Sequence, residues 1–179
     1  MNNRRKFIKK SALGTLGVSS ILSCDETNNA NIKKTYPRII STWNHGLEAN
    51  QKAWESLKNG KGGLSAVEQG VMVSEADPQI RSVGYGGYPD RDGIVTLDAC
   101  IMDKNSNCGS VSFLQNIKHP ISVARHVMED TPHVMLSGKG ALDFAISKGF
   151  KQEDLLTDDS RKDWIKWKEN SNYKPVINI

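Results

Sequence analysis

The sequence predicts an α+β fold in which helices are layered on sheets. Two runs rich in strand-forming residues, Val95–Asp103 and Cys108–Leu114, are joined by the polar residues 104–107, which is typical of a β-hairpin. Stretches with helical spacing of apolar residues precede and follow this hairpin. This order of strands and helices suits helices packed on a sheet and argues against a helical bundle.

One strand and one helix are expected at the start of the fold. The β-branched run at 38–42 predicts a short buried strand. Leu47 and Trp54 stand at helical spacing within 47–59, and Gly60 follows where a glycine often ends a helix. The chain is therefore expected to pass directly from a strand into a helix.

A second helix is predicted to begin near Ser65. Ser65 and Glu68 have the spacing of a capping box, in which each side chain accepts a free backbone N–H at the start of a helix. The helix is expected to stop at Asp77, because Pro78 disfavours the helical conformation of the residue before it.

Three further helices and one short strand are expected after the hairpin. Pro120 favours the first turn of a helix, where its missing N–H has no cost. The last helix carries Trp164 and Trp167 three residues apart, so one side of it is able to pack. The expected elements are helices at 121–129, 141–148 and 158–169, with Gly149 as a cap, and a strand at 134–136.

The chain divides into three parts by composition. Residues 1–24 have a basic start and a short apolar stretch, which predicts an export signal and a periplasmic location. The pair Arg4-Arg5 resembles a twin-arginine signal. Residues 25–35 form a polar, asparagine-rich linker that we expect to be disordered, and residues 36–179 form the folded part.

Membrane anchoring through a lipid is an open alternative. Residues 21–24 loosely resemble a lipoprotein cleavage box, in which Cys24 would be acylated, although Leu22 fits that box imperfectly. The sequence leaves the lipidation of Cys24 undecided.

The charge distribution argues against a nucleic-acid partner. The net charge is +4, but five of the 24 basic residues lie within the first ten positions. Without them, 19 basic residues face 20 acidic ones, so the folded part is close to neutral. A nucleic-acid-binding surface needs a concentrated basic patch.

The chain shows none of the common metal or hydrolase motifs. Its four histidines, His45, His119, His126 and His133, form no His-Glu-x-x-His pair, and the cysteines lack zinc spacing. We therefore expect no metal and no cofactor, and structural or solvated histidines.

Three polar side chains near the hairpin have structural interpretations. Cys100 and Cys108 are expected to be two small buried thiols, with a cross-strand disulfide as the alternative. Asp98 stands on an apolar strand, so we expect it to accept hydrogen bonds from backbone.

The end of the sequence has the composition of a strand. Val176, Ile177 and Ile179 are strand formers, and an apolar strand needs a partner edge. We therefore expect this chain to be half of a larger structure.

Several segments together resemble the N-terminal half of a glycosylasparaginase, a family of N-terminal-nucleophile amidohydrolases. They are Ser-Thr-Trp-Asn-His-Gly at 41–46, Ser-Val-Gly-Tyr-Gly-Gly-Tyr-Pro-Asp-Arg-Asp-Gly at 82–93, Leu-Asp-Ala-Cys-Ile-Met-Asp at 97–103, and His-Pro-Ile-Ser-Val-Ala-Arg at 119–125. The resemblance covers about 36–179.

The resemblance implies a fold and a pocket. The fold would be the N-terminal half of a four-layer αββα sandwich, incomplete on its own. Trp43 matches the tryptophan that shapes the family's substrate pocket, and His45 stands where the family commonly has an aromatic residue, often Phe. We therefore expect Trp43 and His45 to bind substrate.

The resemblance also implies that the catalytic group lies elsewhere. Family members cleave themselves before a threonine, whose hydroxyl becomes the nucleophile and whose α-amine is the base. The matching position lies beyond Ile179, so this chain is expected to carry no catalytic residue. Its partner would be a second, beta half with the N-terminal threonine, and the alpha-beta units would assemble into higher oligomers.

The implied reaction is hydrolysis of the side-chain amide of glycosylated asparagine to aspartate and a glycosylamine. Two alternatives remain. One is an asparaginase or isoaspartyl peptidase of the same family, and the other is an inactive truncated fragment or a binding module that retains the pocket wall.

Overall fold

The computed structural model describes residues 36–172 and Lys174. The predicted export signal with Cys24, the linker at 25–35 and the apolar C-terminal segment 175–179 lie outside the described residues. The described residues from Arg38 onward belong to one unit, which contains all the described helices and strands.

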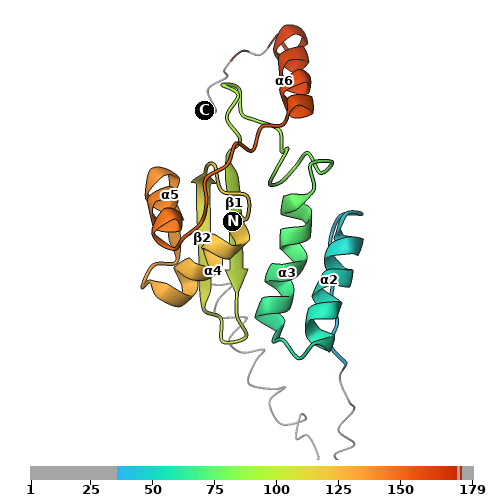
Figure 1. Cartoon of the computed structure of the whole chain (residues 1–179), viewed down its shortest axis with the longest axis vertical. Helices are drawn as coiled ribbons and strands as arrows, with labels where there is room; N and C mark the ends of the chain where they lie inside the picture. The colour runs from blue at the N-terminus through green and yellow to red at the C-terminus, as the bar shows by residue number, and fades with distance from the viewer. Residues whose placement is uncertain (1–35, 173, 175–179) are drawn as a thin grey trace, which may run out of the picture. The chain divides into compact units, whose positions relative to one another are not determined.

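A small mixed sheet forms the centre of this unit (Figure 1). Strand β1 (Leu97–Met102) pairs antiparallel with β2 (Cys108–Leu114), and β2 pairs in parallel with the short β3 (Met135–Ser137). The predicted hairpin is confirmed. Asp103 fixes its turn, because its Oδ1 accepts the N–H groups of Asn105 at 2.8 Å and Asn107 at 2.9 Å.

Five helices are described besides this sheet, and the predicted order of elements after the hairpin is confirmed. Pro120 is the first residue of its helix, as expected. Gly60 and Gly149 follow two of the helices with φ of 77° and 88°, in the left-handed region that glycine adopts without strain. The helices are α2 (Gly46–Lys58), α3 (Gly63–Ala76), α4 (Pro120–Asp130), α5 (Gly138–Ser147) and α6 (Asp158–Asn170).

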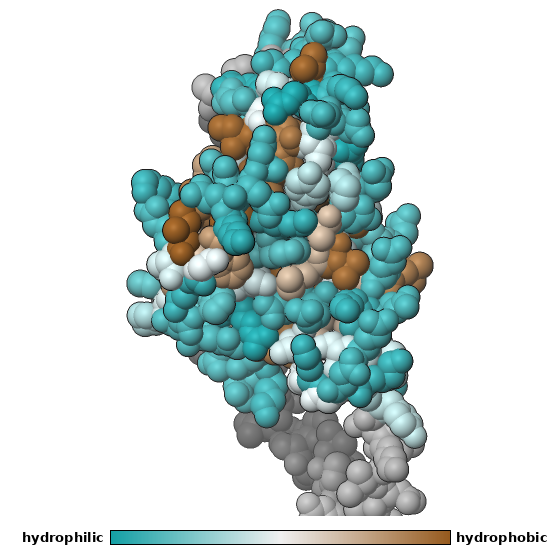
Figure 2. Space-filling model, in the orientation of Figure 1, coloured by the Kyte–Doolittle hydropathy of each residue, from teal (hydrophilic) through white to brown (hydrophobic). Residues whose placement is uncertain are grey.

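The hydrophobic core lies between one face of the sheet and helices α4 and α5. Ile101 and Val111 from this face pack against α4, whose Val123, Ala124 and Val127 are fully buried. The face of the molecule shown in Figure 2 is mainly hydrophilic, with apolar residues scattered over it. Helices packed on a mixed sheet confirm the α+β class.

The opposite face of the sheet has a different character. Met102 and Met135 are more than half exposed there, and Cys100 and Cys108 share this face. Both cysteines are free and exposed in the described part of the chain, so the prediction of two buried thiols is wrong. The strand alternation that buries Ile101 turns Cys100 and Met102 to the other side.

Two predictions about the segments before the hairpin are also wrong: a strand and a helix cap. Residues 38–42 are not a strand, and Ile40 is 89% exposed, because no described strand lies beside them to pair with. Ser65 is not a capping residue, since α3 begins two residues earlier. Instead, Arg125 of α4 donates to Ser65 Oγ at 3.1 Å and to Glu68 Oε2 at 2.7 Å.

The large apolar side chains of α2 do not form its buried face. Leu47 is 75% exposed, whereas Ala53 is buried. A Cβ at Gly70 of α3 would lie 2.7 Å from the carbonyl oxygen of Ala49. Small residues therefore bring α2 and α3 side by side (Figure 1), and the large ones are left outside.

No helix within the described residues is long and apolar enough to cross a bilayer.

Candidate functional site

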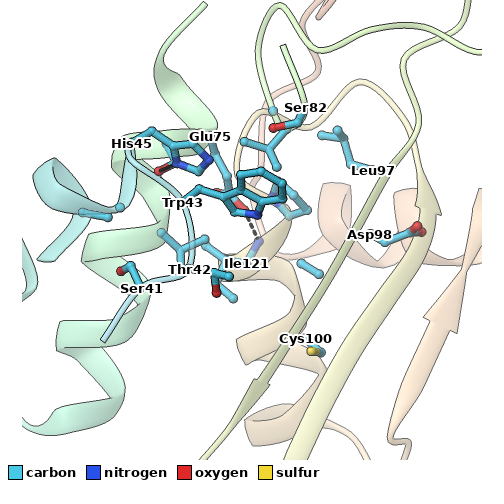
Figure 3. Close-up of a pocket in the computed structure, with 18 of the residues that line it drawn as sticks. Ser41, Thr42, Trp43, His45, Glu75, Ser82, Leu97, Asp98, Cys100 and Ile121 are labelled. Carbon is cyan, nitrogen blue, oxygen red and sulfur yellow. Dashed lines mark hydrogen bonds between the residues drawn. The ribbon is translucent and has the colours of Figure 1, made fainter. Parts of the chain in front are cut away.

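A pocket of about 490 Å³ opens between the first two helices and the edge of the sheet. Five segments line it: residues 41–49 with the first turn of α2, the C-terminal part of α3, the loop at 82–84, the start of β1, and the first turn of α4. Residues about 80 positions apart in the sequence therefore meet at one cavity, which is shown in Figure 3.

A tight turn before α2 forms one wall of the pocket. The N–H of Gly46 donates to the carbonyl of Trp43 at 2.8 Å. A Cβ at Gly46 would lie 2.3 Å from the Cβ of Ser41, so only glycine lets the chain fold back so closely. Ser41 Oγ also donates to Asn50 Oδ1 at 2.5 Å, which fixes the turn to α2.

Both residues predicted to bind substrate line this pocket. Trp43 is 71% exposed, and it lines the pocket together with Glu75 (Figure 3). His45 lies 3.1 Å through its Nδ1 from Ser74 Oγ of α3. The structure thus brings the tryptophan and the histidine of the 41–46 motif to one cavity.

The α3 side of the pocket contains a buried carboxylate that the sequence motifs did not indicate. Glu75 is only 3% exposed and points from α3 towards the start of α4. Its Oε1 accepts the N–H of Ile121 at 3.0 Å, and its Oε2 lies 3.2 Å from Nδ1 of His119. Because the first N–H groups of a helix have no partner within it, Glu75 caps α4 from another helix.

The loop that contains Gly84 supports this wall. The N–H of Tyr85 donates to the carbonyl of Glu75 at 2.8 Å. Gly84 has a φ of 59°, and a Cβ there would lie 2.1 Å from the carbonyl oxygen of Glu75. The loop at 82–84 therefore contacts the backbone of α3 at a distance that only glycine permits.

Burial dominates the electrostatics of Glu75. It raises the pKa of the Glu75 carboxyl above its ordinary value of 4.5, although the hydrogen bonds from His119 and from the N–H of Ile121 oppose this shift. The pocket thus has a carboxyl group whose proton is held more tightly than in water.

Asp98 has a structural function at the edge of the pocket. Its Oδ1 accepts the N–H of Phe113 at 2.9 Å, which confirms the expected hydrogen bond to backbone. Phe113 has a φ of 50°, and the pairing of β1 with β2 is irregular between Leu97 and Ala99. In Figure 3, Asp98 and Cys100 lie along β1, apart from the group of Trp43, His45 and Glu75.

A helical period could have identified Glu75 in advance. Glu75 follows Val71 by four positions and Met72 by three, so it lies on the core-facing side of α3. An acidic residue at such a position needs a partner. The partner was hidden because His119 is 44 residues away in the sequence.

The remaining histidines lie away from the pocket. His126 pairs with Asp130 at 2.8 Å on the exposed side of α4, and His133 is exposed after that helix. Within residues 36–172, no group of His, Cys, Asp and Glu side chains has the arrangement of a metal site.

Comparison with known proteins assigns the family. A family model described as "Asparaginase" matches residues 29–178. An N(4)-(beta-N-acetylglucosaminyl)-L-asparaginase of Elizabethkingia miricola is 55% identical over 185 aligned residues, which cover 99% of this chain and 53% of the relative. A protein of the same name from Rattus norvegicus is 42% identical over 141 residues, covering 76% of this chain and 41% of the relative.

The chain thus spans about half the length of these relatives. The family match includes all five segments that line the pocket. Both comparisons agree with the resemblance of the motifs at 41–46 and 82–93, and the chain belongs to the asparaginase family.

Proposed function

We propose that the protein containing this chain is an amidohydrolase that cleaves the side-chain amide of glycosylated asparagine, and that this chain supplies part of its substrate pocket. Trp43 and His45 bind the substrate on the open wall of the pocket. Glu75 supports the wall formed by α3.

One observation carries this proposal. Trp43 and His45 come from a motif that resembles glycosylasparaginases, and both line the pocket of about 490 Å³. Whole-chain similarity to a relative named N(4)-(beta-N-acetylglucosaminyl)-L-asparaginase supports the same substrate class. Such a pocket, with an aromatic ring and a few polar groups, suits a small polar ligand.

The catalytic threonine belongs to a second half of the protein, which follows this chain. Support comes from the share of the relatives that this chain spans, 53% and 41%. The exposed face of the sheet, with Met102 and Met135, is suited to packing against a second sheet. The complete domain would then be a four-layer αββα sandwich, of which this chain is the N-terminal half.

The proposed reaction has two stages. The threonine hydroxyl attacks the amide carbonyl of the asparagine side chain while the threonine's own α-amine accepts the hydroxyl proton. The glycosylamine leaves with that proton, and an aspartyl ester remains on the threonine. Water then attacks the ester, which releases aspartate and restores the hydroxyl.

A kinetic comparison of three substrates tests this function. The protein that contains this chain is expected to hydrolyse N4-(β-N-acetylglucosaminyl)-asparagine with a higher kcat/KM than free asparagine or an isoaspartyl dipeptide. The reverse preference would favour the asparaginase or isoaspartyl peptidase alternative. A folded product that hydrolyses none of the three would leave only an inactive fragment or a binding module.

Mass spectrometry of the purified protein tests the proposed self-cleavage. A new polypeptide that begins with threonine is the expected product, together with an alpha chain related to residues 36–179. Native mass spectrometry of the same sample would give the assembly, for which we expect oligomers of alpha-beta units. An intact, uncleaved and active enzyme would contradict this mechanism.

Export to the periplasm is part of the same proposal, because residues 1–24 have a basic start and a short apolar stretch. The N-terminus of the mature product is expected to lie after residue 24, or at an acylated Cys24 if the protein is lipid-anchored. An unprocessed N-terminus in the cytoplasmic fraction would contradict export.

A further inference from the structure

We propose that a second cleft, between the loop at 88–91 and helix α6, binds the sugar units of a carbohydrate chain. This aromatic cleft has a volume of about 590 Å³. It is lined by three aromatic and three charged residues: Tyr88, Asp90, Arg91, Asp163, Trp164 and Trp167.

Helix α6 presents aromatic rings without burying an apolar face. The single buried residue among its described positions is Ser160, although the helix contains two tryptophans. Tyr88 of the loop is 59% exposed, and Trp167 of the helix is 43% exposed. An amphipathic helix ordinarily turns such side chains towards the core. The rings of Tyr88 and Trp167 are therefore held at the surface of the cleft.

Polar contacts fix α6 to the loop that faces it. Ser160 donates to the carbonyl of Gly86, and Arg81 donates to Ser160 Oγ at 2.5 Å. Trp164 donates through its Nε1 to the carbonyl of Arg91 at 3.2 Å. A Cβ at Gly93 would lie 2.8 Å from the Trp164 ring, so this ring is part of the wall.

The loop is also rigid by itself. The N–H of Asp90 donates to the carbonyl of Ile94 at 2.8 Å, and Asp90 Oδ1 accepts the N–H groups of Asp92 and Ile94, both at 2.9 Å. The two sides of the cleft are thus positioned before any ligand arrives. Such preorganisation lowers the entropy lost on binding.

The composition of the cleft favours a sugar over other ligands. A pyranose ring has an apolar face, which packs on an aromatic ring, and hydroxyl groups, which bond to carboxylate and guanidinium groups. Asp163 and Arg91 contribute such groups with half or more of each side chain exposed, and each already has a protein partner: Asp163 lies 4.0 Å from Arg81, and Arg91 pairs with Asp92 at 3.2 Å. Two carboxylates disfavour the phosphates of a nucleic acid, and three charged residues disfavour a purely apolar ligand.

The aromatic cleft and the candidate substrate pocket share one loop. Residues 82–84 line the pocket and residues 88–91 line the cleft. Tyr88 comes four positions after Gly84, so their Cα atoms lie at most about 14 Å apart. If the proposed function holds, outer sugar units of the glycan on asparagine extend from the pocket into this cleft. The other ligand with the same chemistry is free carbohydrate that is not attached to the substrate.

Calorimetric titration with N,N′,N″-triacetylchitotriose tests the cleft independently of hydrolysis. The protein that contains this chain is expected to bind this sugar saturably. Trp167→Ala and Tyr88→Ala are each expected to weaken binding about tenfold or more, since each removes a stacking ring. Ile165→Ala is the matched control, because Ile165 is a 45% exposed residue of the same helix that does not line the cleft.

The proposal would be overturned if the wild type showed no saturable heat of binding at millimolar sugar. It would also be overturned if correctly folded Trp167→Ala and Tyr88→Ala bound the sugar with the same affinity as Ile165→Ala. A comparison of KM values identifies whether the bound sugar belongs to the substrate glycan or to free carbohydrate. A KM raised by Trp167→Ala for asparagine carrying three sugars, but not for asparagine carrying one, supports the substrate glycan. Unchanged KM values together with Trp167-dependent binding support free carbohydrate. Absence of all hydrolysis in the wild type refutes the proposed function and leaves the binding result standing.

Discussion

The two walls of the candidate pocket are built in different ways. On the α3 side, Glu75 is 3% exposed, both of its carboxylate oxygens have partners, and Gly84 packs against its backbone. On the α2 side, Trp43 is 71% exposed on a short turn before the helix. The first wall holds the fold together, whereas the second presents side chains to a ligand.

This difference separates stability from binding within one cavity. Changes at the buried wall should lower the free energy of unfolding, because they disturb close contacts and buried hydrogen bonds. Changes at the exposed wall should alter binding with little effect on folding. Substitutions on each wall, made in the protein that contains this chain, test this division.

Gly84→Ala should have the largest effect. The new methyl group would overlap the carbonyl oxygen of Glu75, and alanine is strained at a φ of 59°. We expect the free energy of unfolding to fall by about 3 kcal/mol or more in denaturant titrations. Gly140→Ala is the control, since a Cβ at Gly140 in α5 would meet no described atom within 4 Å. It should be neutral or stabilising, and equal effects of both variants would contradict the contact at Gly84.

Glu75→Ala should come next. It leaves the N–H of Ile121 and the ring of His119 without their buried partner, which we expect to cost about 2 to 4 kcal/mol. Glu129→Ala is the control, because that carboxylate is 40% exposed in its pair with Arg125, and its loss should cost less than about 1 kcal/mol. A Glu75→Ala protein as stable as Glu129→Ala would show that Glu75 does not cap α4.

The pH dependence of stability should report the buried wall. The raised pKa of Glu75 means that the folded state holds its proton more tightly than the unfolded state. The associated stability is therefore complete below the ordinary pKa of 4.5 and is lost as the pH rises through the raised value. Relative to Glu75→Gln, which stays neutral, the wild type should lose stability as the pH increases from about 4. If the difference in free energy of unfolding between the wild type and Glu75→Gln stayed constant across this pH range, the pKa of Glu75 would not be raised.

Trp43→Ala should have the smallest effect on folding. Because the ring is 71% exposed, its removal is expected to change the free energy of unfolding by less than about 0.5 kcal/mol. Thermal unfolding at matched protein concentration measures this. A loss of several degrees in Tm would assign Trp43 to the buried wall.

Local sequence rules predicted the part of the fold that local interactions determine. The hairpin, the helix beginning at Pro120 and the caps at Gly60 and Gly149 each depend on residues close in the chain, and the structure has them all. The strand at 38–42 failed because a strand needs a neighbour, and no described strand pairs with it.

Long-range contacts explain the other failures. Ser65 and Glu68 have the spacing of a capping box, but Arg125, almost 60 residues later, binds both of them. Cys100 has the character of a core residue, yet its position on β1 turns it to the exposed face. For the site, the 41–46 motif indicated Trp43 and His45, whereas the helical period marks Glu75 only as a core-facing acid, and its partner His119 became apparent only in the structure.

Hydrolysis of N4-(β-N-acetylglucosaminyl)-asparagine by Trp43→Ala and Leu47→Ala tests most directly whether the exposed wall of the pocket binds the substrate. The two residues are similarly exposed, at 71% and 75%, and lie four positions apart, but only Trp43 lines the pocket. We expect Trp43→Ala to lower kcat/KM by about tenfold or more and Leu47→Ala to leave it unchanged. Equal kcat/KM values for the two variants would contradict the claim that this wall binds the substrate.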